Sequence, residues 1–108
     1  MDVPEINIDE AARRHSADTP VLDVREPEEY VDGHVPRAVL MPLATVADRV
    51  GEVPTDREVL VICKSGGRSA KAAEHLRAQG INAVNFAGGT QGWIDAGHRV
   101  ATGDEPGS

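Results

Sequence analysis

The sequence predicts an α/β domain in which a mostly parallel, five-stranded sheet carries helices on both faces. Five short apolar runs alternate along the chain with five segments of helical pattern, which is the order typical of a parallel sheet with helical crossovers. The 108 residues are enough for one core and leave no room for a second. We expect a single domain over residues 1–100. A flexible C-terminal tail is expected at 101–108, because that segment is rich in Gly, Asp, Glu and Pro.

Each expected strand is a short run of mainly branched apolar residues. The first run is weak, and the fourth is the continuous sequence Val-Leu-Val-Ile. Apolar runs of this length bounded by turn residues are typical of strands. The five strands are expected at residues 3–8, 21–24, 38–41, 59–62 and 82–86.

A helix is expected after each strand. Pro27 suits the first turn of the second helix, and Gly33 follows its end. The fourth helix has the clearest pattern, because small or apolar residues recur at i, i+3, i+4 and i+7 from Ser69 to Leu76, and Gly80 supplies a C-terminal stop. The five helices are expected at residues 9–15, 27–31, 43–50, 68–79 and 90–96.

The composition narrows the classes of partner. With 18 Asp and Glu against 11 Lys and Arg, the formal net charge is −7, which disfavours nucleic acid or an anionic membrane surface. No apolar stretch is long enough for a membrane helix, and the first residues lack the build of a signal peptide. We therefore expect a cytoplasmic protein. Its single cysteine cannot form an internal disulfide, so the thiol would stay chemically usable.

Cys63 stands where the fourth strand gives way to a glycine-containing loop and then a helix. Ligands bind at the carboxyl ends of parallel strands, and the N–H groups of a helix start favour an anion. A lone cysteine is commonly a buried small apolar residue, but the glycines and cations that follow this one are what a reactive thiol needs. We predict that Cys63 is the catalytic nucleophile. The substrate-binding residues would be Lys64, Ser65, Gly66, Gly67, Arg68 and Ser69, which with Cys63 form the Cys63 loop.

The residues of the Cys63 loop divide by chemistry. Its backbone N–H groups would form an anion cradle, with Gly66 and Gly67 supplying the backbone angles that point them inward. Ser65 or Ser69 would add a hydroxyl donor. Lys64 is expected to be a solvated charge that steers anions, because screening lets local charges dominate at close range.

The spacing from Cys63 to Arg68 argues against a cysteine phosphatase. Cysteine phosphatases also use a Cys-to-Arg loop at a helix start, but with five intervening residues, whereas this loop has four. The smaller ring suits one added sulfur better than a phosphoryl group. Arg68 itself would either bind substrate oxygens or fold back to brace the loop, and both roles stay open.

Three separate motifs resemble those of the rhodanese, or thiosulfate sulfurtransferase, family. The Cys63 loop is similar to the family's active-site loop. Residues 22–30 with 33–36 look like its first signature, and residues 88–93 look like its Gly-Gly-x-x-x-Trp ending. The motifs occur in the family's order across most of the chain. The resemblance implies a three-layer rhodanese-like domain.

The resemblance also implies roles for residues outside the Cys63 loop. Asp23 and Arg25 would be internal supports, and their alternation on a strand lets them pair on one face, although ordinary surface charges would look the same. His34 is expected to be a surface or capping histidine, because no other ligand-type residue shows metal spacing with it. No metal or cofactor is implied. Arg37 stands where the family usually has glycine and would place a charge near the rim of the site.

The chemistry that the resemblance implies is a two-step sulfur transfer. The Cys63 thiolate would attack the outer sulfur of a small anionic donor such as thiosulfate, leaving a persulfide stabilised by the N–H cradle. An acceptor would then remove that sulfur: cyanide in the laboratory, and a thiol, glutathione or a thioredoxin-like protein in a cell. The alternatives are a persulfide carrier or regulatory module serving one protein partner and, with less support, a cysteine phosphatase.

Overall fold

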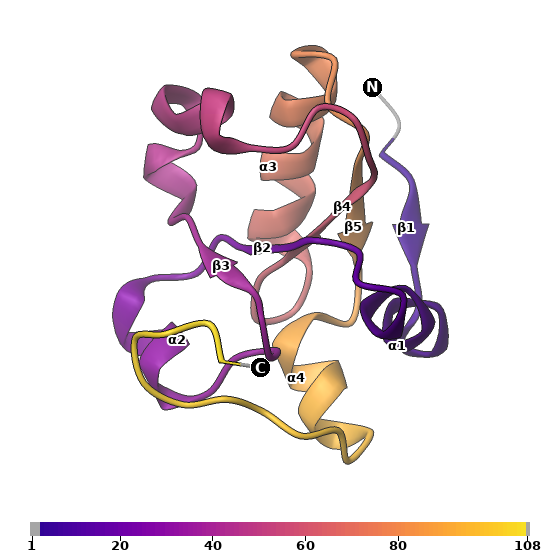
Figure 1. The fold of residues 1–108 in the computed structure, drawn as a ribbon, viewed down its shortest axis with the longest axis vertical. Helices are drawn as coiled ribbons and strands as arrows, with labels where there is room; N and C mark the ends of the chain where they lie inside the picture. Colours follow the sequence, from indigo (N-terminus) through magenta and orange to yellow (C-terminus); the bar gives the residue numbers. More distant parts are fainter. Residues whose placement is uncertain (1–2, 108) are drawn as a thin grey trace.

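The computed structural model describes residues 3–107 and confirms the predicted α/β architecture. Its strands form one sheet in the order β1-β5-β4-β2-β3, and every adjacent pair is parallel. Helices lie on both faces of the sheet and complete three layers (Figure 1). The strands are β1 (Glu5–Ile6), β2 (Val21–Asp23), β3 (Val39–Leu40), β4 (Val59–Ile62) and β5 (Ala83–Phe86).

Three of the described α-helices lie between consecutive strands, and the fourth follows the last strand, β5. Asn7 caps the first helix, since its side chain accepts a hydrogen bond from the backbone N–H of Glu10 at 3.0 Å. Pro27 begins the second helix, as its fixed φ favours. Within residues 3–107, no helix is long and apolar enough to cross a membrane. The helices are α1 (Ile8–Ser16), α2 (Pro27–Asp32), α3 (Gly67–Ala78) and α4 (Gly89–Asp95).

The helix predicted at residues 43–50 is wrong in type. The segment forms two 3₁₀ helices instead, η1 (Leu43–Thr45) and η2 (Ala47–Glu52), with Arg49 in a non-helical conformation. Valine and threonine recur in this stretch, and their branched side chains lower α-helical propensity. The i→i+3 hydrogen bonds of short 3₁₀ turns suit such a connection.

Two hydrophobic clusters fill the spaces between the layers. Along β2, Val21 belongs to one cluster and Leu22 to the other, because successive side chains of a strand point to opposite faces. On the face of α3, Leu76 packs against β4 and β5. On the opposite face, Trp93 of α4 lies in the cluster that also receives side chains from α1 and α2. Burial on both faces explains why the central strands are continuously apolar.

Residues 101–107, expected to belong to a flexible tail, lie against the segment that follows α2 (Figure 1). Ala101 and His34 exchange backbone hydrogen bonds of 2.9 and 2.8 Å as an antiparallel bridge. The backbone N–H of Arg37 donates to the carbonyl of Pro106 at 2.8 Å. Flexibility of this segment in solution, and a domain boundary at residue 100, stay predictions.

His34 was expected to be a surface or capping histidine, and the surface alternative is wrong. Its side chain is fully buried and stacks on the ring of Tyr30, with centroids 3.6 Å apart. Nδ1 lies 2.8 Å from the carbonyl oxygen of Tyr30, and Nε2 lies 3.0 Å from that of Glu105. The surface alternative failed because Glu105, which covers His34, comes from a distant part of the chain. The contact with Tyr30, in the last turn of α2, agrees with the capping alternative.

Candidate active site

Cys63 directly follows β4, at the carboxyl edge of the sheet. The last residue of β4, Ile62, pairs in register with Asp23, the last residue of β2. The segments that follow these two strands therefore begin side by side at the same edge of the sheet. The thiol is free and its residue is only 1% exposed. The chain then turns and enters α3 at Gly67, which places the sulfur at the start of a helix.

Hydrogen-bond donors converge on the sulfur of Cys63. The backbone N–H of Gly66 lies 3.1 Å from Sγ, and the hydroxyl of Ser69 lies 3.3 Å from it. Burial raises the pKa of the Cys63 thiol, but hydrogen bonds from Ser69 and from the backbones of Gly66 and Ser65 outweigh burial and hold the pKa below its ordinary value. The Cys63 loop therefore stabilises an anion at this sulfur.

The two serines and the lysine of the loop take different positions. Ser69 is buried and supplies the hydroxyl that faces Sγ, whereas the side chains of Ser65 and Lys64 are exposed. An exposed Lys64 agrees with the expected solvated charge.

Only one of the two loop glycines has an unusual backbone conformation. Gly66 has φ +106°, and a Cβ there would lie 2.4 Å from the carbonyl oxygen of Ala87. Gly67 begins α3 without a positive φ, and a Cβ there would meet nothing within 4 Å. The expectation that both glycines supply special backbone angles is therefore wrong for Gly67.

The start of α4 is fastened to the Cys63 loop. The backbone N–H of Thr90 donates to the carbonyl of Cys63 at 2.8 Å, and that of Gln91 donates to the carbonyl of Lys64 at 3.1 Å. Gly89 has φ +64°, and a Cβ there would lie 2.3 Å from the Lys64 carbonyl oxygen. A glycine at position 89 is thus needed for this close approach.

Arg68 braces the loop against α2. Its Nη1 and Nη2 lie 2.7 and 2.9 Å from the two carboxylate oxygens of Glu29. The hydrogen bond from Arg68 is the main reason that the pKa of Glu29 falls from 4.5 to about 2. Sequence reasoning missed Glu29, because nothing in its local pattern separates it from the neighbouring acidic residues of α2. Of the two roles left open for Arg68, bracing is the one this geometry describes.

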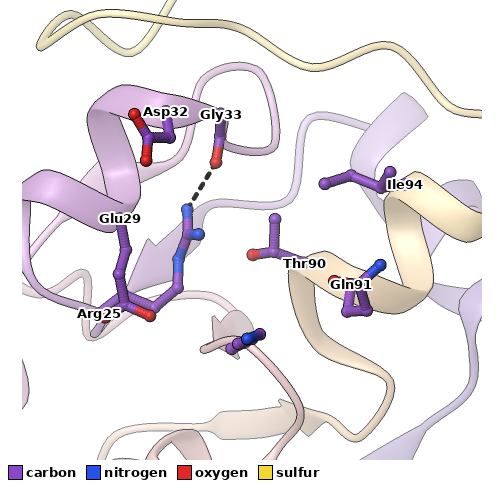
Figure 2. A pocket seen from close by; sticks show the side chains of 8 residues that line it. Arg25, Glu29, Asp32, Gly33, Thr90, Gln91 and Ile94 are labelled. Carbon is purple, nitrogen blue, oxygen red and sulfur yellow. Dashed lines mark hydrogen bonds between the residues drawn. The ribbon is translucent and has the colours of Figure 1, made fainter.

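Asp23 and Arg25 form a buried ion pair. Arg25 Nη2 donates to Asp23 Oδ2 at 2.8 Å, and its Nε lies 3.0 Å from Oδ1. The same Nη2 donates to the carbonyl of Gly33 at 2.8 Å, which ties the edge of β2 to the end of α2 (Figure 2). The predicted pairing is confirmed, although Arg25 lies beyond the end of β2, and the alternative of ordinary surface charges is wrong.

Arg37 does not lie near the rim of the site as expected. Its guanidinium binds the carboxylate of Asp18 and donates to the carbonyl of His15 at 2.7 Å. Arg37 has φ +72°, a conformation that glycine adopts freely and other residues rarely do.

A pocket of about 330 Å³ lies beside the Cys63 loop. Figure 2 shows Arg25 and Glu29 on one side of the opening and Thr90 of α4 across from them. Arg25 is already paired with Asp23, and Glu29 with Arg68. Lys64 is therefore the cation of the loop that faces an incoming anion. The lining residues are Arg25, Glu29, Asp32, Gly33, Lys64, Thr90, Gln91 and Ile94.

Asn85 is a second residue that sequence reasoning missed. It is fully buried in β5 and accepts a hydrogen bond from Ser69, which places it one residue away from the sulfur of Cys63. Its signal was an amide inside an otherwise apolar strand, since a buried polar side chain requires partners.

The chain is similar to several known proteins. Residues 7–96 match the family model described as a rhodanese-like domain. A protein of Allochromatium vinosum named sulfurtransferase is 35% identical over 98 residues, which cover 88% of this chain and 92% of that protein. A Bacillus subtilis protein named "Putative sulfur carrier protein YrkF" is 37% identical over 94 residues, covering 84% of this chain and 51% of that protein. A rhodanese-related protein from Thermoplasma volcanium has a solved structure that superimposes with a TM-score of 0.86 at 35% identity, covering 91% of this chain and 97% of that one.

Proposed function

The chain belongs to the rhodanese-like domain family, and from this premise we propose that it is a sulfurtransferase that works through a persulfide on Cys63. Sulfur transfer in the broad sense is the activity that the family and the names of its relatives support. The observation that carries the finer proposal is the set of donors on Sγ, from Gly66 at 3.1 Å and Ser69 at 3.3 Å. A Cys63 persulfide would be an anion that extends one sulfur atom beyond Sγ, and hydrogen-bond donors around Sγ would stabilise its negative charge.

The reaction balances with the residues present and a small anionic donor. The Cys63 thiolate attacks the outer sulfur of thiosulfate, an S–S bond forms as the sulfur–sulfur bond of the donor breaks, and sulfite leaves with the bonding pair. Lys64 supplies positive charge at the pocket of a chain whose net charge is −7. In the second step, a thiolate acceptor, from a small thiol or a thioredoxin-like protein, attacks the outer sulfur, and the Cys63 thiolate is the leaving group.

Phosphoryl transfer fits this site less well. A cysteine phosphatase needs its loop arginine to hold the phosphoryl oxygens, whereas the guanidinium of Arg68 is already bound at two points by Glu29. Sulfur transfer therefore fits the site better than phosphatase chemistry does.

A second candidate is a persulfide carrier that serves one protein partner. The name of the Bacillus subtilis relative favours it, and this chain spans about half of that relative's length. The Cys63 side chain is only 1% exposed, so a persulfide would be presented from a recessed position that a fitted partner could reach.

Intact-mass measurement tests the proposal. The protein is incubated with thiosulfate, excess donor is removed, and the mass is compared with that of Cys63→Ser. We expect a gain of one sulfur atom in the wild type alone, lost again on addition of dithiothreitol. Discharge by cyanide or glutathione supports a small-molecule transferase, and discharge by a protein thiol alone supports the carrier. No adduct, together with hydrolysis of an aryl phosphate, would overturn sulfur transfer.

A further inference from the structure

Asn85 connects the Cys63 loop to the first strand of the sheet. It is fully buried, and in register it pairs with Glu5 of β1. Its Nδ2 donates to the carboxylate of Glu5 at 3.0 Å and to the carbonyl of Gly66 at 3.2 Å. Its Oδ1 accepts from the hydroxyl of Ser69. Every polar atom of this side chain therefore has a partner.

These partners fix which way the amide points. The Gly66 atom that faces Nδ2 is a backbone carbonyl oxygen, which can only accept a hydrogen bond, and the Glu5 carboxyl group faces the same nitrogen. Nδ2 must therefore face them, and Oδ1 must face Ser69. Since a carbonyl oxygen cannot donate, the Asn85 side chain is an acceptor toward the Ser69 hydroxyl in every protonation state of the site.

The hydroxyl of Ser69 has two acceptors and only one proton. Its oxygen lies 2.5 Å from Asn85 Oδ1 and 3.3 Å from Cys63 Sγ. While Cys63 is a thiol, its S–H can donate to Ser69 Oγ, and Ser69 can donate to Asn85. Once Cys63 is a thiolate, it can only accept, so the two acceptors compete for the same proton.

We propose that the Ser69 hydroxyl turns its proton from Asn85 to the Cys63 sulfur whenever that sulfur becomes anionic, and that Asn85 is the positioning residue that holds the alternative partner. The proposal rests on the proposed role of Cys63 as nucleophile. No proton enters or leaves the site in this movement, because the hydroxyl only rotates about its C–O bond.

The movement fits the two steps of sulfur transfer. In the persulfide, the negative charge lies on the outer sulfur, and Sγ becomes a neutral divalent sulfur, singly bonded to Cβ and to the outer sulfur, that accepts hydrogen bonds only weakly. The hydroxyl then returns to Asn85. When an acceptor removes the outer sulfur, Sγ regains the electron pair, and the hydroxyl turns back to stabilise it as a leaving group.

The competition between Asn85 and Cys63 for the Ser69 proton predicts the direction in which each substitution shifts the pKa of Cys63. Ser69→Ala removes the mobile donor, so the pKa of Cys63 rises and the thiolate fraction at neutral pH falls by roughly tenfold, as expected for one hydrogen bond to a charged group. Asn85→Leu removes the competing acceptor, so the Cys63 pKa falls. In the Ser69→Ala background, Asn85→Leu has nothing left to redirect and produces no further shift.

Ultraviolet titration of the thiolate measures these shifts without any sulfur donor. The chain has one cysteine, so the signal belongs to Cys63. Its one tyrosine does not interfere, because burial raises the pKa of Tyr30 to about 12. Opposite shifts in the single variants and no additional shift in the double variant support the proposal. An equal Asn85→Leu shift in both backgrounds, or a rise in the pKa, would mean that Asn85 acts only on the shape of the loop and would overturn it.

A second measurement avoids the risk that Asn85→Leu does not fold. The side-chain amide resonances of Asn85 are followed by NMR as Cys63 titrates, in the wild type and in Ser69→Ala. We expect them to move with the Cys63 titration in the wild type and to lose most of that movement in Ser69→Ala. Equal movement in both proteins, or none in either, contradicts the proposal. A protein that shows the coupling but forms no persulfide would refute the proposed function alone.

Discussion

Arg68 and Glu29 face each other with both nitrogens of the guanidinium fork against both carboxylate oxygens, at 2.7 and 2.9 Å. The pair joins the first turn of α3 to α2, although 39 residues separate the two side chains in the sequence. It closes the Cys63 loop on the side of the pocket. We therefore expect Arg68 to position the loop and not to surround a substrate anion.

Arg68→Ala is expected to lower stability through loss of this brace. Both side chains are about one-third exposed, so solvent screening limits the loss to about 0.5–1 kcal/mol. Urea unfolding of Arg68→Ala, Glu29→Ala and the double variant gives the coupling between them, and Lys71→Ala, at an exposed position on α3, is the control. If Arg68→Ala raised the KM for thiosulfate while stability stayed unchanged, substrate binding would replace bracing as its role.

The contribution of the pair depends on pH. The pKa of Glu29 is lowered from 4.5 to about 2, so the carboxylate stabilises the folded state fully above about pH 4.5 and loses this effect as the pH falls toward 2. The difference in unfolding free energy between wild type and Glu29→Gln is therefore expected to shrink as the pH is lowered from about 7 to about 3. A difference that stayed constant over this range would show that the ion pair does not form in solution.

The parts of the site that could be predicted are local in the sequence. The apolar runs predicted the positions of the strands. The Cys63 loop could be predicted because it is formed by consecutive residues, and the glycines and cations within it indicate a turn at a helix start. The pairing of Asp23 and Arg25 could be predicted from their spacing of two residues, although Arg25 lies beyond the end of β2. These inferences needed no knowledge of distant segments.

The parts that were missed depend on contacts between distant segments. Glu29 meets Arg68, and Asn85 meets Ser69, only after the sheet and helices are assembled. Burial of His34 depends on the carbonyl of Glu105, 71 residues away. A sequence pattern can indicate that a side chain is buried or needs a hydrogen-bond partner. It does not identify which distant residue is that partner.

The two glycines of the Cys63 loop are expected to respond oppositely to alanine. At Gly66, the positive φ and a Cβ 2.4 Å from the Ala87 oxygen predict a loss of at least about 2 kcal/mol. At Gly67, space is open and the backbone is helical, so alanine is expected to be neutral or to stabilise by up to about 1 kcal/mol. Denaturant unfolding of both variants measures the contrast, and equal effects would contradict the loop geometry.

Loss of charge at Asp23 is expected to be costly. Asp23→Asn leaves the cation of Arg25, which is only 5% exposed, without a counter-charge. Breaking a buried pair in this way costs about 3 kcal/mol, which thermal or urea unfolding would detect. Asp48→Asn, at an exposed position, is the control and should stay within about 0.5 kcal/mol of wild type. A small loss at Asp23 would show that water reaches the pair.

Arg37 offers a test of backbone strain outside the site. At φ +72°, any side chain with a Cβ carries a cost of about 1–2 kcal/mol that glycine does not. Arg37→Gly and Arg37→Ala both lose the contacts with Asp18 and His15, so their difference isolates the backbone. We expect the glycine variant to be the more stable by about 1 kcal/mol in urea unfolding.

The control for this comparison is the same pair of substitutions at Lys71, in the middle of α3. There the backbone is helical, so alanine should be more stable than glycine by about 1 kcal/mol, the reverse of the order at Arg37. If alanine were the more stable at both positions, Arg37 would not hold a left-handed conformation in solution. The expected reversal would instead explain in physical terms why the family usually has glycine here.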